Sequence, residues 1–192
     1  VKELGTKVSY EDTIVVDGKT YFLEEKKVYL LNKPRGVICS VSDEVGRKTV
    51  VELIDTDKRI YPVGRLDYDT TGLLLLTNDG ELANVLMHPR HHVEKTYVAK
   101  LNKFLEPGDL MKLKKGVLVE GVLCKPTRVT VKKYDKEKDY SIVEVTLVEG
   151  RNHIVDKLTR IQYGFLTLEH LKSGEYRELS LKEVKKLYEY KR

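Results

Sequence analysis

The chain has 192 residues, of which 41% are hydrophobic, 34% charged and 8% aromatic, and it contains no Trp. This length accommodates one domain, or one domain with a small appendage, and the long apolar-patterned stretches exclude a largely disordered protein. The net charge of +5 permits a polyanionic partner without requiring one, because dense charge of mixed sign is commonly a solvated surface.

The number of cysteines and the length of the apolar runs indicate the cellular compartment of the protein. Cys39 and Cys124 are too few for a disulfide framework or a Cys-rich metal site, so we interpret them as thiols in a reducing compartment. The longest uninterrupted apolar run, Leu73–Leu76, is far short of the roughly 20 residues that a membrane span requires. No apolar signal segment follows Val1. We therefore expect a monomeric, cytoplasmic protein without a membrane partner.

Residues 1–25 are predicted to form a short β element. Asp17-Gly18 is a strong hairpin turn between two short runs of apolar residues. Twenty-five residues cannot bury a core of their own, so this element is either a docked hairpin or the end of a larger module. The charged stretch 24–27 is a candidate boundary.

The remaining chain contains many short strands and few helices. Strands are expected at 28–32, 37–41, 61–63, 72–77, 96–101, 117–119, 128–134, 140–148 and 155–161. Helices are expected at 48–54, 81–87 and 109–115, and a last one after Ser180, which forms a capping box with Glu183. Strands that do not alternate strictly with helices predict an α+β fold with a mixed, mainly antiparallel sheet.

The most unusual segment is the polar loop 65–71, which lies between two predicted strands and is rich in Arg, Asp and Thr. Loops held on a rigid sheet commonly carry function. Arg65 precedes Asp67 by two residues, and a nearby cation keeps a carboxylate ionised. The alternative is a turn whose Asp and Thr side chains bond only their own backbone.

This segment resembles the signature of the RsuA-like family of ribosomal RNA pseudouridine synthases. Further motifs of that family occur in the same order over about residues 28–180, so that the matching segments are 31–37, 64–80, 86–90, 95–97, 149–153 and 174–179. A single motif of this kind is weak evidence, whereas five or more in order are strong.

The resemblance implies a role for two residues. Asp67 corresponds to the catalytic aspartate, which attacks the ribose, attacks the base or removes a proton while the uracil leaves C1′ and rejoins through carbon 5. The sequence does not distinguish these three routes. Tyr97 corresponds to the active-site tyrosine, whose ring stacks on the target base. Its alternative is a strand aromatic packed in the core.

The resemblance also implies ribosomal RNA as the partner and a set of residues that bind it around a flipped nucleotide. For any one of the cations the alternative is ordinary surface charge. The expected RNA-binding residues are Lys33, Arg35, Arg65, Arg90, Arg151, Asn152 and His153.

No metal or other cofactor is implied. His88, His91 and His92 are close in sequence, but no Cys or carboxylate accompanies them at ligand spacing, so we expect solvated histidines. Isomerisation of a base–sugar bond is redox-neutral and requires no cofactor.

The pattern breaks after His153. The family motif continues through a Gln, an apolar residue and an essential Arg or Lys into an amphipathic helix, whereas here residues 155–161 resemble the strand that follows that helix. Either the chain has lost the helix and the basic partner of Asp67, or a segment is absent between about Ile154 and Asp156. We favour the second, because losing a helix would expose core.

Two organisational hypotheses follow. Residues 1–25 resemble the end of a small RNA-binding domain of the α-L type, and residues 26–192 would form the catalytic domain. A catalytically inactive rRNA-binding or ribosome-assembly protein is an alternative function. A nuclease or phosphotransferase is a third, and it would need Asp67 and Asp69 to bind Mg²⁺ together.

Overall fold

The computed structural model describes residue 9 and residues 12–22, 24–119, 122–148 and 158–191. The strands in these ranges are β1 (Ile14–Val16), β2 (Lys19–Tyr21), β3 (Val28–Lys33), β4 (Tyr61–Pro62), β5 (Thr71–Thr77), β6 (Lys95–Leu101), β7 (Val117–Val119), β8 (Val122–Cys124), β9 (Arg128–Asp135), β10 (Tyr140–Leu147), β11 (Leu158–Tyr163), β12 (Leu166–Thr167) and β13 (Tyr176–Glu178). The helices there are α1 (Gly80–Met87), α2 (Pro107–Lys115) and α3 (Leu181–Tyr188), with 3₁₀ turns η1 (Val51–Leu53), η2 (Pro89–His91) and η3 (Glu189–Lys191).

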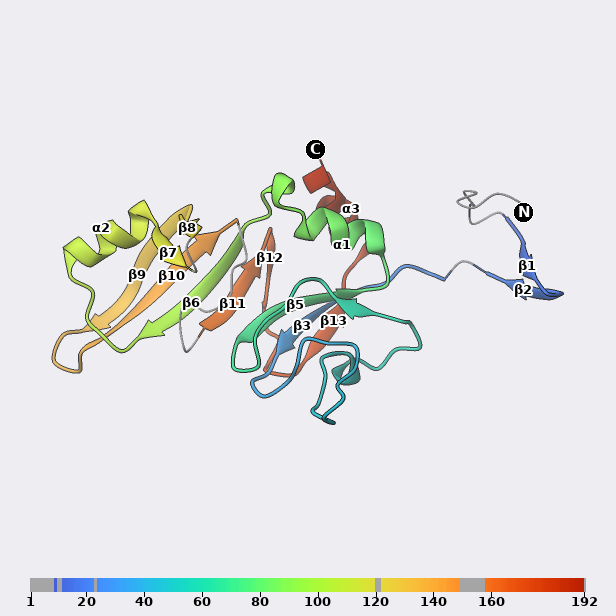
Figure 1. The fold of residues 1–192 in the computed structure, drawn as a ribbon, viewed down its shortest axis with the longest axis horizontal. Helices are drawn as coiled ribbons and strands as arrows, with labels where there is room; N and C mark the ends of the chain where they lie inside the picture. The colour runs from blue at the N-terminus through green and yellow to red at the C-terminus, as the bar shows by residue number, and fades with distance from the viewer. Residues whose placement is uncertain (1–8, 10–11, 23, 120–121, 149–157, 192) are drawn as a thin grey trace.

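A nine-stranded sheet organises the chain. Its main path runs β13-β3-β5-β11-β6-β10-β9, with β4 beside β5 and β12 beside β11. Among the described strands of this sheet, β5 and β11 form the single parallel pair and all other neighbours are antiparallel. The structure therefore confirms the α+β class with a mixed, mainly antiparallel sheet. Figure 1 shows α1 and α3 near one end of the sheet and α2 near the other.

Strand β5 is a continuous apolar run because both of its faces are covered. Leu73 and Leu75 pack in one core with Leu82 and Leu187 of α1 and α3. Leu74 and Leu76 face the opposite side and join a second core with residues of 50–60. All four β5 leucines are fully buried. A central strand of this kind holds the loop before it on a rigid base.

Helices α1 and α3 begin at residues that cap them, and the capping box predicted at Ser180 is confirmed. Asp79 caps α1, and one of its carboxylate oxygens accepts a hydrogen bond from the backbone N–H of Leu82 at 3.3 Å. The capping box of α3 is complete, with Ser180 and Glu183 bonded to each other's backbone N–H groups. Pro89 follows the end of α1, as expected for a residue that cannot continue a helix.

Two local predictions differ from the structure. The expected strand 37–41 is wrong: Ile38 makes one isolated bridge to Thr49, because no neighbouring strand lies alongside this segment to pair with it. The expected helix 48–54 is reduced to the single turn η1. Glu52 accepts hydrogen bonds from the N–H and hydroxyl of Thr49, which favours a tight local turn over a longer helix.

The N-terminal hairpin β1–β2 matches the predicted turn. Asp17 and Gly18 both have positive φ, at 48° and 75°, which is the backbone that a two-residue hairpin loop requires. Figure 1 shows this hairpin apart from the sheet. Val15, Val16, Tyr21 and Phe22 leave their apolar side chains exposed. The assignment of residues 1–25 to a separate RNA-binding domain stays a prediction.

Candidate active site

A cavity of about 760 Å³ extends over one face of β6, β10 and β11, from the loop before β5 to α2. This volume is within the range of small-molecule sites. Most of the lining is apolar, from strand residues such as Ala99, Val143 and Val145. The charged side chains that the structure places on the lining are Arg65, Asp67, Lys95, Asp109, Lys112 and Arg160.

Asp67 lies in the loop between β4 and β5 and is half-buried. Its backbone carbonyl accepts a hydrogen bond from Thr70 N–H at 3.0 Å, which closes a tight turn around the side chain. Asp67, Arg65 and Leu66 line both the large cavity and a second cavity of about 330 Å³. The loop thus borders two cavities, and Asp67 belongs to the lining of both.

The buried side chain of Lys33 holds the loop of Asp67 through hydrogen bonds to its backbone carbonyls. Its side chain is fully buried, and its ammonium group donates hydrogen bonds to the carbonyls of Thr70 at 2.8 Å, Asp67 and Pro34 at 3.1 Å, and Tyr68 at 3.4 Å. Burial lowers the pKa of Lys33. The structure therefore corrects the expectation that Lys33 binds a phosphate: its donors are engaged by the backbone that carries Asp67.

Replacing Lys33 by Met is expected to lower the free energy of unfolding by about 2–4 kcal/mol, because the carbonyls that it satisfies would be left without a donor. Urea denaturation measures this loss. Lys48→Met is the matched control, since Lys48 is exposed and its replacement should change stability by less than about 0.5 kcal/mol. Equal stability of wild type and Lys33→Met would contradict this role.

Tyr97 and Arg160 meet across neighbouring strands. They are paired in the β6–β11 register, and both are buried, with 7% and 2% of their surface exposed. Arg160 Nε donates to the carbonyl of Leu73 at 2.6 Å. The guanidinium carbon lies 6.0 Å from the ring centroid of Tyr97 and 5.1 Å from that of Tyr163. Aromatic rings and a backbone carbonyl therefore hold this cation in place.

Lys95 is a second cation on the same cavity face. Its ammonium group donates to the carbonyls of Val93 at 3.3 Å and Val148 at 3.4 Å, and lies 5.0 Å from the Tyr163 ring centroid. Burial, with a further contribution from the charge of Arg160, lowers the pKa of Lys95 to about 8. Lys95 is therefore a cation of the cavity lining whose pKa is lowered to about 8, and it lies near the buried Arg160.

Lys95→Met is expected to stabilise the protein at pH 7 by about 1–3 kcal/mol, because it removes a charge that the folded state holds at a cost. The folded pKa lies below the unfolded value, so the unfolded state binds more protons between pH 8 and 10.5, and wild-type stability from this group rises across that window. Thermal unfolding at pH 7 and at pH 10.5 checks this. A gain of the same size at both pH values would assign it to packing instead.

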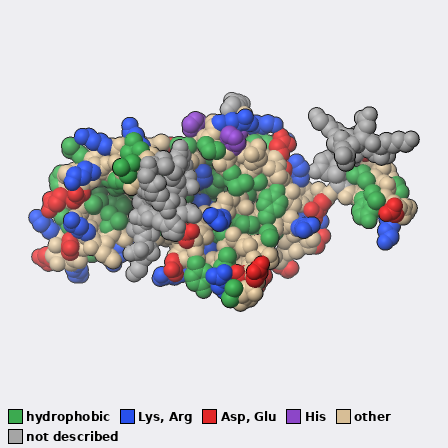
Figure 2. Space-filling model, in the orientation of Figure 1, with side chains coloured by type: hydrophobic (Ala, Val, Ile, Leu, Met, Phe, Trp, Pro, Cys, Tyr) green, Lys and Arg blue, Asp and Glu red, His purple; other side chains and the backbone are tan. Residues whose placement is uncertain are grey.

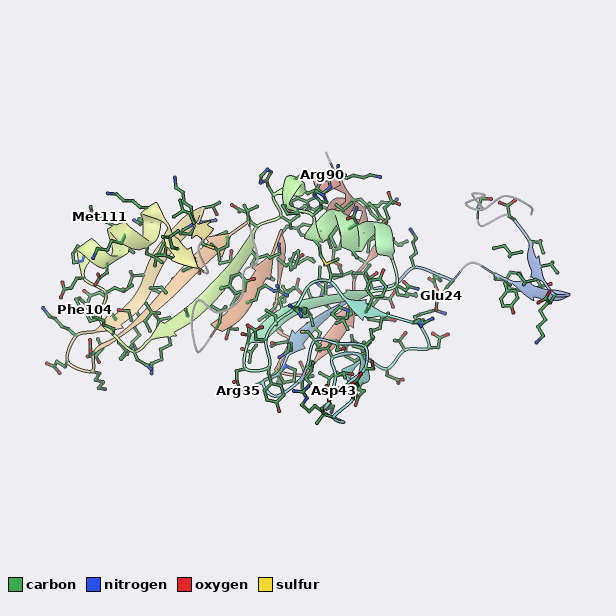
Figure 3. The ribbon with its side chains drawn as sticks, viewed as in Figure 1. Glu24, Arg35, Asp43, Arg90, Phe104 and Met111 are labelled. Atoms are coloured by element: carbon green, nitrogen blue, oxygen red, sulfur yellow. The ribbon has the colours of Figure 1, made fainter. Side chains whose placement is uncertain are left out.

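Arg35, Arg65 and Arg90, the other expected RNA-binding cations that the structure describes, do not lie together at one place. Arg65 is exposed at the cavity wall. Arg35 forms an exposed ion pair with Asp69, with Nε to Oδ1 at 2.7 Å, and Arg90 bonds the ring of His91. Figure 3 places Arg35 and Arg90 at opposite edges of the view, and in Figure 2 Lys and Arg side chains are spread over the visible face. Arg151, Asn152 and His153, with the expected break near 154–156, lie outside the described residues.

Lys95 and Arg160 line the cavity but were not among the site residues expected from the sequence. A signal for Lys95 was present, since residues 95 and 97 of a strand share one face, so Lys95 had to point with Tyr97. Leu158-Thr159-Arg160 resembles the Leu-x-Arg end of a strand in the family pattern, but the place of Arg160 in the cavity depends on pairing with a strand some 60 positions earlier. In the part of the chain that the structure describes, no three His, Cys, Asp or Glu side chains gather to bind a metal.

The sequence and the mixed sheet match a known class of enzyme. Residues 27–158 match the model of the RNA pseudouridylate synthase family. The chain therefore belongs to this family, and it is an isomerase that converts uridine in RNA to pseudouridine. None of the described helices has the length and apolar character needed to cross a membrane.

Relatives and solved structures agree with this assignment. The chain is 47% identical to the ribosomal large subunit pseudouridine synthase B of Bacillus subtilis, over 97% of this chain and 82% of that protein. It is 38% identical to an uncharacterized RNA pseudouridine synthase of Aquifex aeolicus, over 98% and 80%. A crystal structure of a pseudouridylate synthase superposes with a TM-score of 0.73 at 33% identity, covering 97% of this chain and 85% of that one. An archaeal box H/ACA Nop10–Cbf5 complex, at 19% identity and a TM-score of 0.51, shares the fold.

Proposed function

We propose that this protein isomerises a specific uridine of ribosomal RNA to pseudouridine in the 760 Å³ cavity, with Asp67 as the essential catalytic group. The observation that carries the proposal is the position of Asp67, half-buried in the cavity wall on a loop that Lys33 braces from below. The substrate class follows from the resemblance to the ribosomal pseudouridine synthase B of B. subtilis.

The cavity suits a nucleotide removed from its stack. A base inside an RNA helix cannot reach a recessed carboxylate, so the target uridine must rotate out to enter. Tyr97 then offers a ring for stacking, and Asp67 a carboxylate for nucleophilic attack or proton removal. In the net reaction the N1–C1′ bond breaks and a C5–C1′ bond forms, while C5 loses a proton and N1 gains one.

We assign RNA backbone contacts to the exposed cations. Arg65, at the cavity wall, is placed to meet a phosphate next to the flipped nucleotide. Arg35 and Arg90 would contact more distant phosphates, and residues 151–153 are proposed to bind RNA from the segment before β11. We further propose that the protein acts as a monomer in the cytoplasm, where ribosomal RNA is modified.

One observation favours the second candidate, an inactive rRNA-binding protein. The alignment with the B. subtilis relative spans 200 positions, more than the 192 residues of this chain, so that relative carries residues with no counterpart here. If the missing residues include the basic partner of Asp67, activity would be lost. The intact mass of the protein purified from its source decides whether the chain is longer than the 22.2 kDa of this sequence.

The function is tested with ribosomal RNA labelled with tritium at C5 of uridine. Purified protein is expected to release tritium in proportion to pseudouridine formed, and mapping of the product should show one or a few modified positions. RNA that already carries these modifications is the control and should release none. Binding of ribosomal RNA without tritium release would favour the inactive alternative.

A further inference from the structure

The cavity contains a buried donor without a partner. Among the described residues, three buried side-chain nitrogens make no hydrogen bond: His91 Nδ1, Arg177 Nε and Arg160 Nη2. Of these three residues, Arg160 is the one that lines the large cavity. A buried N–H that stays unpaired lowers stability, and more so when it is charged, so such a group calls for an explanation.

The guanidinium of Arg160 is held in a defined orientation. Its Nε–H is bonded to Leu73, the rings of Tyr97 and Tyr163 lie beside it, and its backbone lies against Gly72 of β5. An arginine cannot lose its proton in a protein. The unpaired N–H group therefore belongs to a charged, preorganised side chain of a residue that lines the cavity.

The surroundings of Arg160 limit the chemical groups of a substrate that its unpaired N–H can bind. Phosphates are served by exposed cations such as Arg65, whereas Arg160 lies beside aromatic rings in a largely apolar recess. A flat, neutral ring with acceptor oxygens on its edge fits that recess better than a phosphodiester anion, which would have to lose its hydration water. The pyrimidine of uridine is such a ring, with carbonyl oxygens at C2 and C4.

We infer that Arg160 is a catalytic residue whose free guanidinium N–H donates a hydrogen bond to a carbonyl oxygen of the target uracil and stabilises the negative charge that this oxygen acquires. The inference rests on the proposed use of the cavity for the flipped uridine. It adds a contact to the base, as distinct from the contacts to ribose and phosphate.

The contact strengthens as the reaction proceeds. When the N1–C1′ bond breaks, its electron pair stays with the base, and the charge spreads onto the carbonyl oxygens. If Asp67 instead adds to the base ring, the electrons displaced from the C5–C6 double bond also move onto a carbonyl oxygen. In both routes a fixed cation at that oxygen lowers the barrier, and removal of one such donor typically costs 10²–10³ in rate.

The test combines protein variants with sulfur-substituted RNA. Sulfur accepts hydrogen bonds poorly, so 2-thiouridine or 4-thiouridine at the target position weakens one carbonyl contact at a time. For wild type, single-turnover rates are expected to fall at least about tenfold with one of the two thio substrates. Arg160→Met should be slower by about 100-fold on ordinary uridine, yet respond to that sulfur by less than about twofold.

Arg177→Gln is the matched control, because Arg177 also has a buried unpaired nitrogen but lies outside the cavity lining. It should retain the full sulfur effect of wild type. Sulfur effects of equal size in wild type and Arg160→Met would overturn the inference and leave Arg160 a structural residue. This comparison is independent of Asp67, so failure of the aspartate assignment would be seen separately, as turnover by an Asp67 variant.

If Arg160→Met does not fold, the contact between Arg160 and the base is tested by a measurement on the wild-type protein. The guanidinium N–H signals of ¹⁵N-arginine-labelled protein, assigned to Arg160 with the charge-conserving variant Arg160→Lys, should shift on binding RNA with a uridine at the target. They should stay unshifted with RNA that has an abasic site there. The same shift with both RNAs would refute a contact to the base.

Discussion

Asp67→Asn is expected to abolish pseudouridine formation while the affinity for ribosomal RNA changes by less than about tenfold. The substitution keeps the size of the side chain and removes its charge, so nucleophilic attack and proton removal are both lost. Phosphate contacts of the exposed cations remain, and they supply most of the binding. Tritium release measures turnover, and a filter-binding titration at fixed salt measures affinity.

Asp69→Asn is the control for this experiment. Asp69 lies two residues further along the same loop and pairs with Arg35 at the surface, and it does not line the large cavity. Its replacement should retain most of the turnover. Full turnover by Asp67→Asn would refute the catalytic assignment. An equal loss in both variants would show that the loop needs its negative charge in general and that Asp67 has no special role.

Gly72→Ala is expected to lower the free energy of unfolding by more than about 3 kcal/mol, and to abolish activity with it. A Cβ at this position would lie 2.2 Å from the carbonyl oxygen of Arg160 and 2.8 Å from its backbone nitrogen. Backbone atoms of a paired strand cannot give way, so β5 and β11 would have to separate. The φ angle of 104° adds strain for any residue with a side chain.

Gly174→Ala distinguishes the steric contact of a new Cβ from the strain of a positive φ angle. Gly174 also has a positive φ, of 87°, but a Cβ there would meet no atom within 4 Å. Its replacement should cost only the backbone strain, about 1 kcal/mol. Urea denaturation of both variants provides the comparison. Similar losses for the two variants would mean that the approach of Arg160 to Gly72 does not constrain the sheet.

The parts of the fold that local sequence could predict are those with a local cause. Asp17-Gly18 indicates a hairpin because few other residue pairs tolerate two positive φ angles in succession. The run Leu73–Leu76 indicates a strand covered on both faces, and Ser180 with Glu183 indicates a helix start. The segment 37–41 has the same apolar character as a strand, but no partner strand lies beside it, and pairing is not a local property.

The candidate site also has features that the sequence predicts and features that it does not. Sequence alone was enough to predict the family, the fold class and the loop that carries Asp67, because motif order and apolar periodicity are present in the chain before it folds. The sequence did not indicate which of the expected RNA-binding cations are buried and which are exposed. Lys33 and Arg35 are two residues apart, yet one is fully buried beneath the Asp67 loop and the other is exposed.

The burial of Lys33 and Arg160 depends on contacts between segments that are distant in the sequence. Lys33 is internal because β3 pairs with β5, whose preceding loop offers the ammonium group its backbone carbonyls. Arg160 is in the cavity because β11 lies between β5 and β6. A charged side chain leaves water only where distant segments supply its partners, and the positions of those segments are set by the pairing of the whole sheet.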